Sequence, residues 1–260
     1  MDLLIGVAVF AVLVPIGLKL AARQDRRGHR PPYRHSPRSS RPPRPRRGGG
    51  PPRPGASASA QADRLRRRAR GGVGRRAAAG FGIRSRAAEG DRADAARWAA
   101  GAEGERRTGR LLERLGPSWI SLHDRALPRG RANVDHLVIT PTGALVNVDS
   151  KMWGAKDAVH VRSGRVFHGA EDRTDRVESA LYESRTVAGV LGRPVATVVV
   201  VHGARVTGGR ITLPGATIVP ADSLLALLRQ IDRESGRRPD PGAVRALMER
   251  AEAGLPPYPG

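Results

Sequence analysis

The pattern of apolar and polar positions divides the chain into three regions. Residues 3–18, LLIGVAVFAVLVPIGL, are apolar without a break. Residues from Arg23 to about Ala88 contain almost no large apolar side chains and are rich in Pro, Gly, Ser and Arg. From about Gly90 onward, apolar residues recur at spacings typical of helices and strands, which predicts a folded domain.

The first half of the predicted domain contains a helix followed by strands. The helix covers residues 90–116, with Asp91 or Asp94 as its N-cap and Gly116 at its end. A short strand follows it, and two longer strands, 132–140 and 143–153, are then joined by Pro-Thr-Gly. Because a proline followed closely by glycine suits a tight turn, we expect these two strands to pair antiparallel.

The second half alternates between helices and strands. A hairpin is predicted around Ser163 and Gly164, and a helix over 174–191. The β-branched run VATVVVVHG at 195–203 is typical of a strand that is covered on both faces. One further strand and two helices complete an α/β fold with a mixed sheet flanked by helices.

The N-terminal apolar stretch predicts a membrane anchor. Sixteen helical residues span about 24 Å, and extension to Ala22 reaches about 30 Å, the thickness of the hydrocarbon core. Asp2 is the only charged side chain before the stretch, and arginines follow it. The positive-inside rule therefore predicts a single-pass protein of the cell membrane, with its N-terminus outside and its C-terminal domain cytoplasmic. A cleaved signal peptide and a peripheral amphipathic helix are the alternatives.

Charge is concentrated in the segment that follows this anchor. Of 46 Lys and Arg residues in the 260-residue chain, 22 arginines lie within 23–98, against five acidic residues, a net charge of +17. Such a segment buries too little apolar surface to offset its ordering entropy, so residues 23–89 are predicted to form a disordered linker. It could act as a spacer, bind anionic lipid headgroups or contact nucleic-acid phosphates. The chain has no cysteine, which excludes disulfides and thiolate metal sites.

Candidate chemistry lies at the end of the most apolar hairpin. Asp149 and Lys151 are two residues apart on a strand and therefore share a face, together with Asn147. Asp135 lies on the preceding strand at a similar distance from the turn. Two carboxylates that converge there would bind a hard cation such as Mg²⁺ or Mn²⁺. Lys151, one of only three lysines in the chain, would orient or activate a water molecule or offset negative charge on a phosphate.

The predicted helix before the strands offers another carboxylate. Gly101, Glu105, Thr108 and Leu112 follow one another at spacings of three and four, so they lie along one face. Small residues around a single glutamate allow that face to approach the sheet closely. Glu103 lies off this face, so Glu105 is the preferred site residue.

These motifs together resemble the nuclease-related domain family, NERD, of the PD-(D/E)xK or restriction-endonuclease-like superfamily. The resemblance covers about 99–231 and is carried by GAEGE at 101–105, NVDHLVITPTGALVNVDSKMWG at 133–154 and VATVVVVHG at 195–203. It implies a restriction-endonuclease-like fold and metal-dependent hydrolysis of phosphodiester bonds.

The resemblance also implies roles for individual residues. Asp135, Asp149 and Glu105 would bind metal, and Lys151 would act with them in catalysis. Trp153 would be a packing neighbour. Many members of the family have a glutamine on the helix after the second hairpin, where this chain has Glu178 or Glu183 and no glutamine.

The sequence therefore predicts four regions: an anchor over 1–22, a linker over 23–89, a nuclease-like domain over 90–235, and a C-terminal helix and tail over 236–260. The predicted function is membrane-tethered, metal-dependent hydrolysis of nucleic acid, most simply DNA, with membrane contact through 3–22. One alternative is a weakly active or inactive nuclease-fold module that binds nucleic acid. Another is a structural membrane protein with a lipid-binding basic segment.

Overall fold

The computed structural model describes residues 52–74, 81–128, 132–236 and 240–259. These residues fall within one compact unit, Gly48–Gly260. The predicted anchor over 1–22 and the linker up to residue 51 lie outside the described residues. None of the helices in the described ranges is long and apolar enough to cross a membrane.

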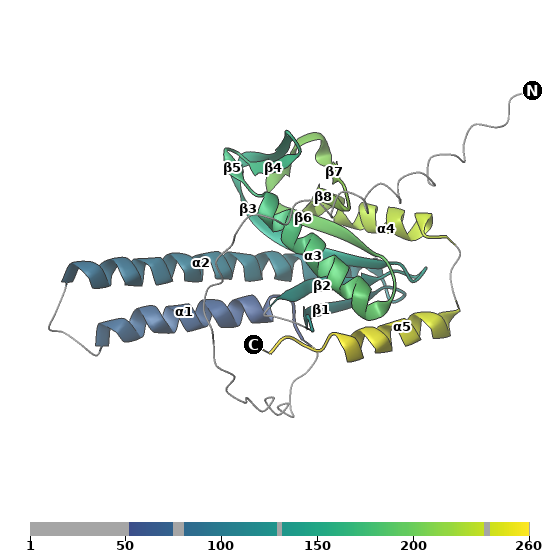
Figure 1. Cartoon of the computed structure of the whole chain (residues 1–260), viewed down its shortest axis with the longest axis horizontal. Coiled ribbons are helices and arrows are strands. Elements are labelled where there is room, and N and C mark those ends of the chain that lie inside the picture. The colour runs from purple at the N-terminus through teal and green to yellow at the C-terminus, as the bar shows by residue number, and fades with distance from the viewer. Residues whose placement is uncertain (1–51, 75–80, 129–131, 237–239, 260) are drawn as a thin grey trace, which may run out of the picture. The chain divides into compact units, whose positions relative to one another are not determined.

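The core of the unit is a mixed sheet of eight strands (Figure 1). Its main order is β1-β2-β3-β6-β8-β7, and β4 and β5 extend from the far part of β3. Strand β6 pairs parallel with β3 and with β8, and the other pairs are antiparallel. The strands are β1 (Ile120–Ala126), β2 (Asn133–Ile139), β3 (Leu145–Arg162), β4 (Arg165–His168), β5 (Glu171–Asp172), β6 (Val195–Val206), β7 (Ile211–Leu213) and β8 (Ala216–Pro220).

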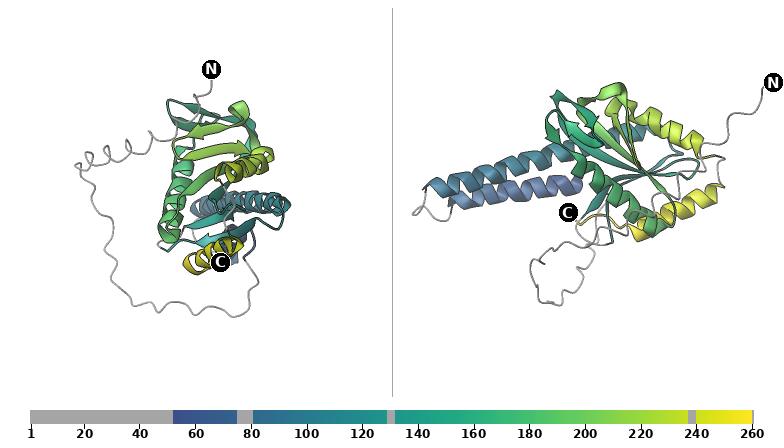
Figure 2. Two further views of the ribbon diagram at one scale, coloured as in Figure 1. Left: turned by 90° about the vertical axis from the view of Figure 1, so that its right-hand side faces the viewer. Right: turned by 45° about the horizontal axis from the view of Figure 1, so that its top comes forward.

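Helices cover both faces of the sheet (Figure 2). The end of α2 and α4 pack on the face that carries Val146, Val148 and Val200. Helices α3 and α5 pack on the face that carries Leu137 and Leu145. The helices are α1 (Ala56–Gly74), α2 (Phe81–Leu112), α3 (Thr174–Leu191), α4 (Leu224–Glu234) and α5 (Pro241–Gly254), with short 3₁₀ turns η1 (Glu113–Leu115), η2 (Thr207–Gly209) and η3 (Ala221–Ser223).

The predicted α/β architecture with a mixed sheet is confirmed, and so are both hairpins. The first turn closes with the N–H of Gly143 donating to the carbonyl of Thr140 over 2.8 Å. The second turn has positive φ at both Ser163 and Gly164, which is the geometry of a type I′ turn. The strand at 195–203 lies inside the sheet between β3 and β8, which explains why its residues are β-branched on both faces.

The disordered linker predicted for 23–89 is wrong for its C-terminal part. Residues 56–74 form α1, and α2 begins at Phe81, so Asp91 and Asp94 lie within a helix instead of capping one. Helix α1 packs along α2 with a buried row of small side chains and one leucine: Ala58, Ala62, Leu65 and Ala69. The stability of α1 comes from packing against α2. Helix propensity and mean hydropathy are properties of a single segment, so they do not indicate such a contact.

The C-terminal helix, placed outside the domain by the sequence, contributes to its core. Leu247 and Ala251 of α5 are buried in the same cluster as Val187 and Leu191 of α3. The tail then contacts β1, because the N–H of Tyr258 donates to the carbonyl of Asp124 over 2.8 Å. Helix α5 and the tail therefore close one side of the domain.

The start of α1 should be sensitive to substitution. Gly55 has φ +75°, and a Cβ there would lie 2.6 Å from the carbonyl oxygen of Ala102 in α2. We expect Gly55→Ala to lower the free energy of unfolding by at least about 1–2 kcal/mol, the cost of a left-handed backbone for a non-glycine residue. Urea unfolding followed by circular dichroism measures this change.

Gly90→Ala is the matched control. Gly90 lies within α2, and a Cβ there meets nothing within 4 Å. We expect this variant to gain up to about 1 kcal/mol from higher helix propensity. Equal stability of the two variants would contradict the close packing of α1 against α2.

Candidate catalytic site

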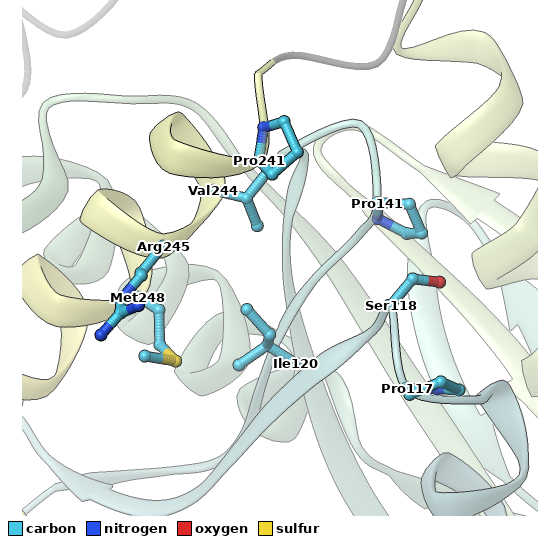
Figure 3. A pocket seen from close by; sticks show the side chains of 8 residues that line it. All are labelled: Pro117, Ser118, Ile120, Pro141, Pro241, Val244, Arg245 and Met248. Atoms are coloured by element: carbon cyan, nitrogen blue, oxygen red, sulfur yellow. The ribbon is translucent and has the colours of Figure 1, made fainter.

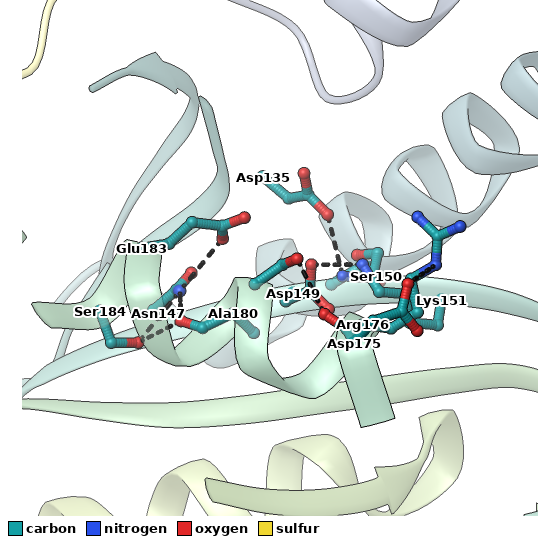
Figure 4. A network of polar contacts seen from close by, with 12 residues as sticks. Asp135, Asn147, Asp149, Ser150, Lys151, Asp175, Arg176, Ala180, Glu183 and Ser184 are labelled. Carbon is teal, nitrogen blue, oxygen red and sulfur yellow. Dashed lines mark hydrogen bonds and ion pairs between the residues drawn. The ribbon is translucent and has the colours of Figure 1, made fainter. Parts of the chain in front are cut away.

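The β2–β3 hairpin places three predicted site residues on one face of the sheet. The pairing register joins Leu137 to Asn147 and His136 to Val148. One step further along the two strands, Asp135 and Asp149 lie next to each other, with Lys151 beyond them (Figure 4). The structure therefore brings Asp135, Asp149 and Lys151 together, as the sequence predicts.

Direct contacts tie these side chains together. The Nζ of Lys151 donates to Oδ1 of Asp149 over 2.6 Å, and their side chains are 20% and 4% exposed. The backbone N–H of Ser150 donates to Oδ2 of Asp135 over 2.9 Å. The lysine is thus fixed beside one carboxylate, and the backbone between Asp149 and Lys151 holds the other.

Glu105 reaches the same region from α2. It is only 6% exposed, and its Oε2 has no hydrogen-bond partner among the described residues. Glu103, by contrast, is paired with arginines on its own helix, at 2.9 Å in the case of Arg107. Of these two glutamates, Glu105 is therefore the buried one and Glu103 lies in an ion-pair cluster on the outer side of α2.

A hydrogen-bonded chain on the opposite face of β3 fixes α2 to the sheet. Ser150 Oγ donates to Thr108 Oγ1 over 2.8 Å, and Thr108 Oγ1 lies 2.8 Å from His202 Nε2. All three side chains are buried. Thr108 follows Glu105 by about one helical turn, so this chain sets the position of the glutamate relative to β3.

The histidine beside Asp135 belongs to the core, because adjacent residues on a strand point to opposite faces of the sheet. His136 is fully buried, and its Nδ1 lies 2.7 Å from Nδ1 of His123. Trp153 also packs as expected, since its ring stacks on His168 with centroids 5.8 Å apart.

Mutual repulsion and burial shift the acid–base properties of the site. Burial, with the charge of Asp135 next in weight, raises the pKa of Glu105 to about 9. Burial and the charge of Asp149 raise the pKa of Asp135 to about 7. Burial alone would lower the pKa of Lys151, but the carboxylates of Asp149 and Asp135 outweigh it and hold that pKa above its usual value. The ammonium of Lys151 is therefore charged at neutral pH.

Helix α3 adds a carboxylate whose position the sequence left open between Glu178 and Glu183. Glu178 is exposed, whereas Glu183 is partly buried beside Asn147. Burial, followed by the charges of Asp149 and Asp135, raises the pKa of Glu183 to about 9. The available sequence signal was its place one residue before Ser184, on the stripe of α3 that faces the sheet.

The donor set fits a hard divalent cation. Glu105 Oε2 and Asp149 Oδ2 are buried oxygens without a partner in the described part of the chain, and carboxylate oxygens are the ligands that Mg²⁺ and Mn²⁺ prefer. Within the described residues, no three or more His, Cys, Asp or Glu side chains are already arranged to hold a metal ion. Lys151 occupies one oxygen of Asp149, and Ser150 occupies one of Asp135, so the carboxylates would have to turn to share an ion.

An apolar groove of about 470 Å³ lies elsewhere (Figure 3). It runs between the β2–β3 turn, the segment before β1 and helix α5, and is lined by Pro117, Ser118, Ile120, Pro141, Pro241, Val244, Arg245 and Met248. Pro141 is at the turn, whereas Asp135 and Asp149 are at the opposite end of the paired strands. The groove carries no carboxylate, so it is separate from the catalytic candidates.

Comparison with known protein families gave a match over the part of the chain that carries these residues. The family model of the nuclease-related domain, NERD, matches residues 100–202. This range contains Glu105, Asp135, Asp149, Lys151 and Glu183. Searches of curated proteins and of solved structures gave no match.

Stability should depend on pH through the buried acids. Because the pKa of Glu105 is raised from 4.5 to about 9, the folded state holds more protons than the unfolded state between these values. The free energy of unfolding of the cation-free protein should therefore fall as pH rises from about 5 to 9. Glu105→Gln should flatten this dependence and be the more stable form at pH 8, with Asp135 and Glu183 supplying the slope that remains.

Urea unfolding at several pH values in the presence of a chelator measures the effect. Glu113→Gln, which changes an exposed glutamate in η1, is the control and should keep the wild-type slope. Identical slopes for wild type and Glu105→Gln would show that Glu105 is not a buried acid.

Proposed function

Because residues 100–202 carry a nuclease-related domain, we propose that the chain is a membrane-tethered nuclease that hydrolyses nucleic-acid phosphodiester bonds with Mg²⁺ or Mn²⁺. The observation that carries this proposal is the cluster of Asp135, Asp149 and Lys151, with a buried glutamate approaching from α2. Carboxylates and one fixed cationic group on a single face suit the positioning of a phosphate and a water molecule.

Each residue has a separate role in this mechanism. Asp135, Asp149 and Glu105 would hold the cation. When bound, the cation supplies a Lewis acid and lowers the pKa of a coordinated water. Lys151 would stabilise the negative charge that develops on the phosphate, or orient the water molecule. The raised pKa of Lys151 favours these roles over that of a general base, because a charged ammonium has no free electron pair.

Exposed arginines on α1 support a polyanionic partner. Arg64, Arg67 and Arg68 have no ion-pair or hydrogen-bond partner in the described structure. Helix α1 packs against α2, the helix that carries Glu105. Arginine binds phosphate oxygens in a bidentate manner, so α1 offers contacts to a nucleic-acid backbone.

The proposed tether consists of residues 3–22, which lie outside the described residues. Its support is the length of the apolar stretch and the arginines that follow it. The arginine-rich residues after it would also attract anionic lipid headgroups at the same membrane surface. The proposed location is the cell membrane, with the nuclease-related domain on the cytoplasmic side.

Loss of the lysine should abolish cleavage without unfolding the protein. We expect the purified full-length chain to cleave plasmid DNA, linear DNA or RNA in Mg²⁺ or Mn²⁺. Lys151→Met should be slower by about 100-fold or more, the effect usual for removing a group that stabilises developing charge. Gel analysis of the products, with circular dichroism to verify folding, measures both outcomes.

Lys156→Met is the control for charge. Lys156 lies on the same strand but is exposed, and it should keep wild-type activity. Cleavage by Lys151→Met at the wild-type rate would contradict the proposed role. Salt-sensitive retention of DNA without cleavage by the wild type would instead support the binding module.

Removal of residues 3–22 should release the chain from membranes. We expect the full-length chain to sediment with membranes after washing at high salt and at alkaline pH, and the shortened chain to remain in the supernatant. Salt extraction of the full-length chain would show that only the basic residues hold it at the membrane, which would overturn the proposed anchor.

A further inference from the structure

We propose that Glu183 is a fourth cation-binding carboxylate of this site and that Asn147 holds it in place. The inference rests on the proposed function, because it concerns the same cation. The resemblance gives the metal-binding and catalytic roles to residues of α2, β2 and β3 and assigns no metal ligand to α3, and Glu183 would add a carboxylate from that helix. Figure 4 shows its side chain extending over Asn147 toward Asp135 and Asp149.

A chain of buried polar groups fixes the carboxylate of Glu183. Asn147 Nδ2 lies 3.4 Å from Glu183 Oε2, 3.1 Å from Ser184 Oγ and 3.2 Å from the carbonyl of Ala180. Ser184 Oγ in turn accepts a hydrogen bond of 2.7 Å from Thr197 Oγ1. Strands β3 and β6 are therefore connected to α3 through the side chains of Asn147 and Thr197.

Burial of this polar chain calls for an explanation. Asn147, Ser184 and Thr197 are each at most 4% exposed, between α3 and the face of the sheet on which it packs. Polar groups in such a place cost free energy unless they are fully bonded, and Oδ1 of Asn147 has no described partner. Apolar residues at these three positions would pack at least as well. What the hydrogen-bonded polar groups add is a fixed position for Glu183 beside Asn147, Asp149 and Lys151.

The balance of charge at the site points to a cation. Four carboxyl groups, those of Glu105, Asp135, Asp149 and Glu183, interact electrostatically with the ammonium of Lys151, and only Asp149 is in direct contact with it. The second oxygen of Asp149 is buried and has no partner among the described residues, which is an independent sign of a ligand. Without a cation, repulsion and burial leave protons on the weaker acids, as the raised pKa of Glu183 indicates. A divalent cation would replace those protons once the carboxylates turn toward it, and it would then satisfy the buried oxygens of Asp149 and Glu105.

Glu183→Gln separates cation binding from a purely structural role. Glutamine has nearly the same shape and can still accept the hydrogen bond from Asn147, but it lacks the charge. A structural role is therefore kept in this variant, and only an interaction that needs the carboxylate is lost.

The experiment measures Mn²⁺ binding to the purified full-length chain, without nucleic acid, from the electron paramagnetic resonance signal of free Mn²⁺. We expect Glu183→Gln to weaken binding by at least about tenfold, a loss common when a group at a metal site is removed. Glu178→Gln, at an exposed position of the same helix, should stay within about twofold of wild type. Asp149→Asn should also weaken binding, which identifies the site that is observed.

The outcomes separate the two proposals. Wild-type affinity in Glu183→Gln, together with weak binding in Asp149→Asn, would overturn the role of Glu183 and leave the nuclease proposal intact. Absence of Mn²⁺ binding in the wild type would also overturn it. Weakened binding in Glu183→Gln, with no cleavage of any nucleic acid by the wild type, would support Glu183 as a cation ligand and contradict the nuclease function.

Discussion

The ion pair between Lys151 and Asp149 is the interaction on which the candidate site depends. Both groups lie on β3, and neither could be buried there alone without a large desolvation cost. Their contact is short, but it satisfies only one oxygen of Asp149. With Asp135, Glu105 and Glu183 nearby, the site has more acidic groups than basic ones, and the weaker acids hold protons while no cation is bound. That excess is costly for folding, and it is useful for attracting a cation.

The rest of the domain serves to hold these acids close together despite their repulsion. Pairing of β2 with β3 sets Asp135 next to Asp149, and the N–H of Ser150 fixes it there. The hydroxyl of Ser150 points to the other face and binds Thr108, which keeps α2 and Glu105 against the sheet. One residue thus connects the two faces, because its backbone and its side chain bond in opposite directions. Packing on both faces supplies the free energy that makes this arrangement tolerable.

Helix α2 links the site to the basic part of the chain. Its C-terminal half carries Glu105 and packs on the sheet, and α1 packs along it through small side chains. The arginines of α1 are therefore held on a rigid helix pair and not on a flexible linker. A substrate backbone bound along α1 would lie at a defined place relative to Glu105, which a disordered segment could not provide.

The sequence by itself determined the hairpin of β2 and β3, the shared face of Asp149 and Lys151, the central strand β6 and the face of α2 that carries Glu105, because alternation, turn residues and helical spacing are local properties. Tertiary structure alone decided the rest. Alanine-rich α1 is stable only against α2, so no local signal distinguished it from a linker. Glu183 was one of two candidates on α3 until the contact with Asn147, 36 positions away in the sequence, placed it at the site. The stability of α1 and the placement of Glu183 both depend on contacts between segments far apart in the sequence. Such contacts follow from the packing of the whole chain.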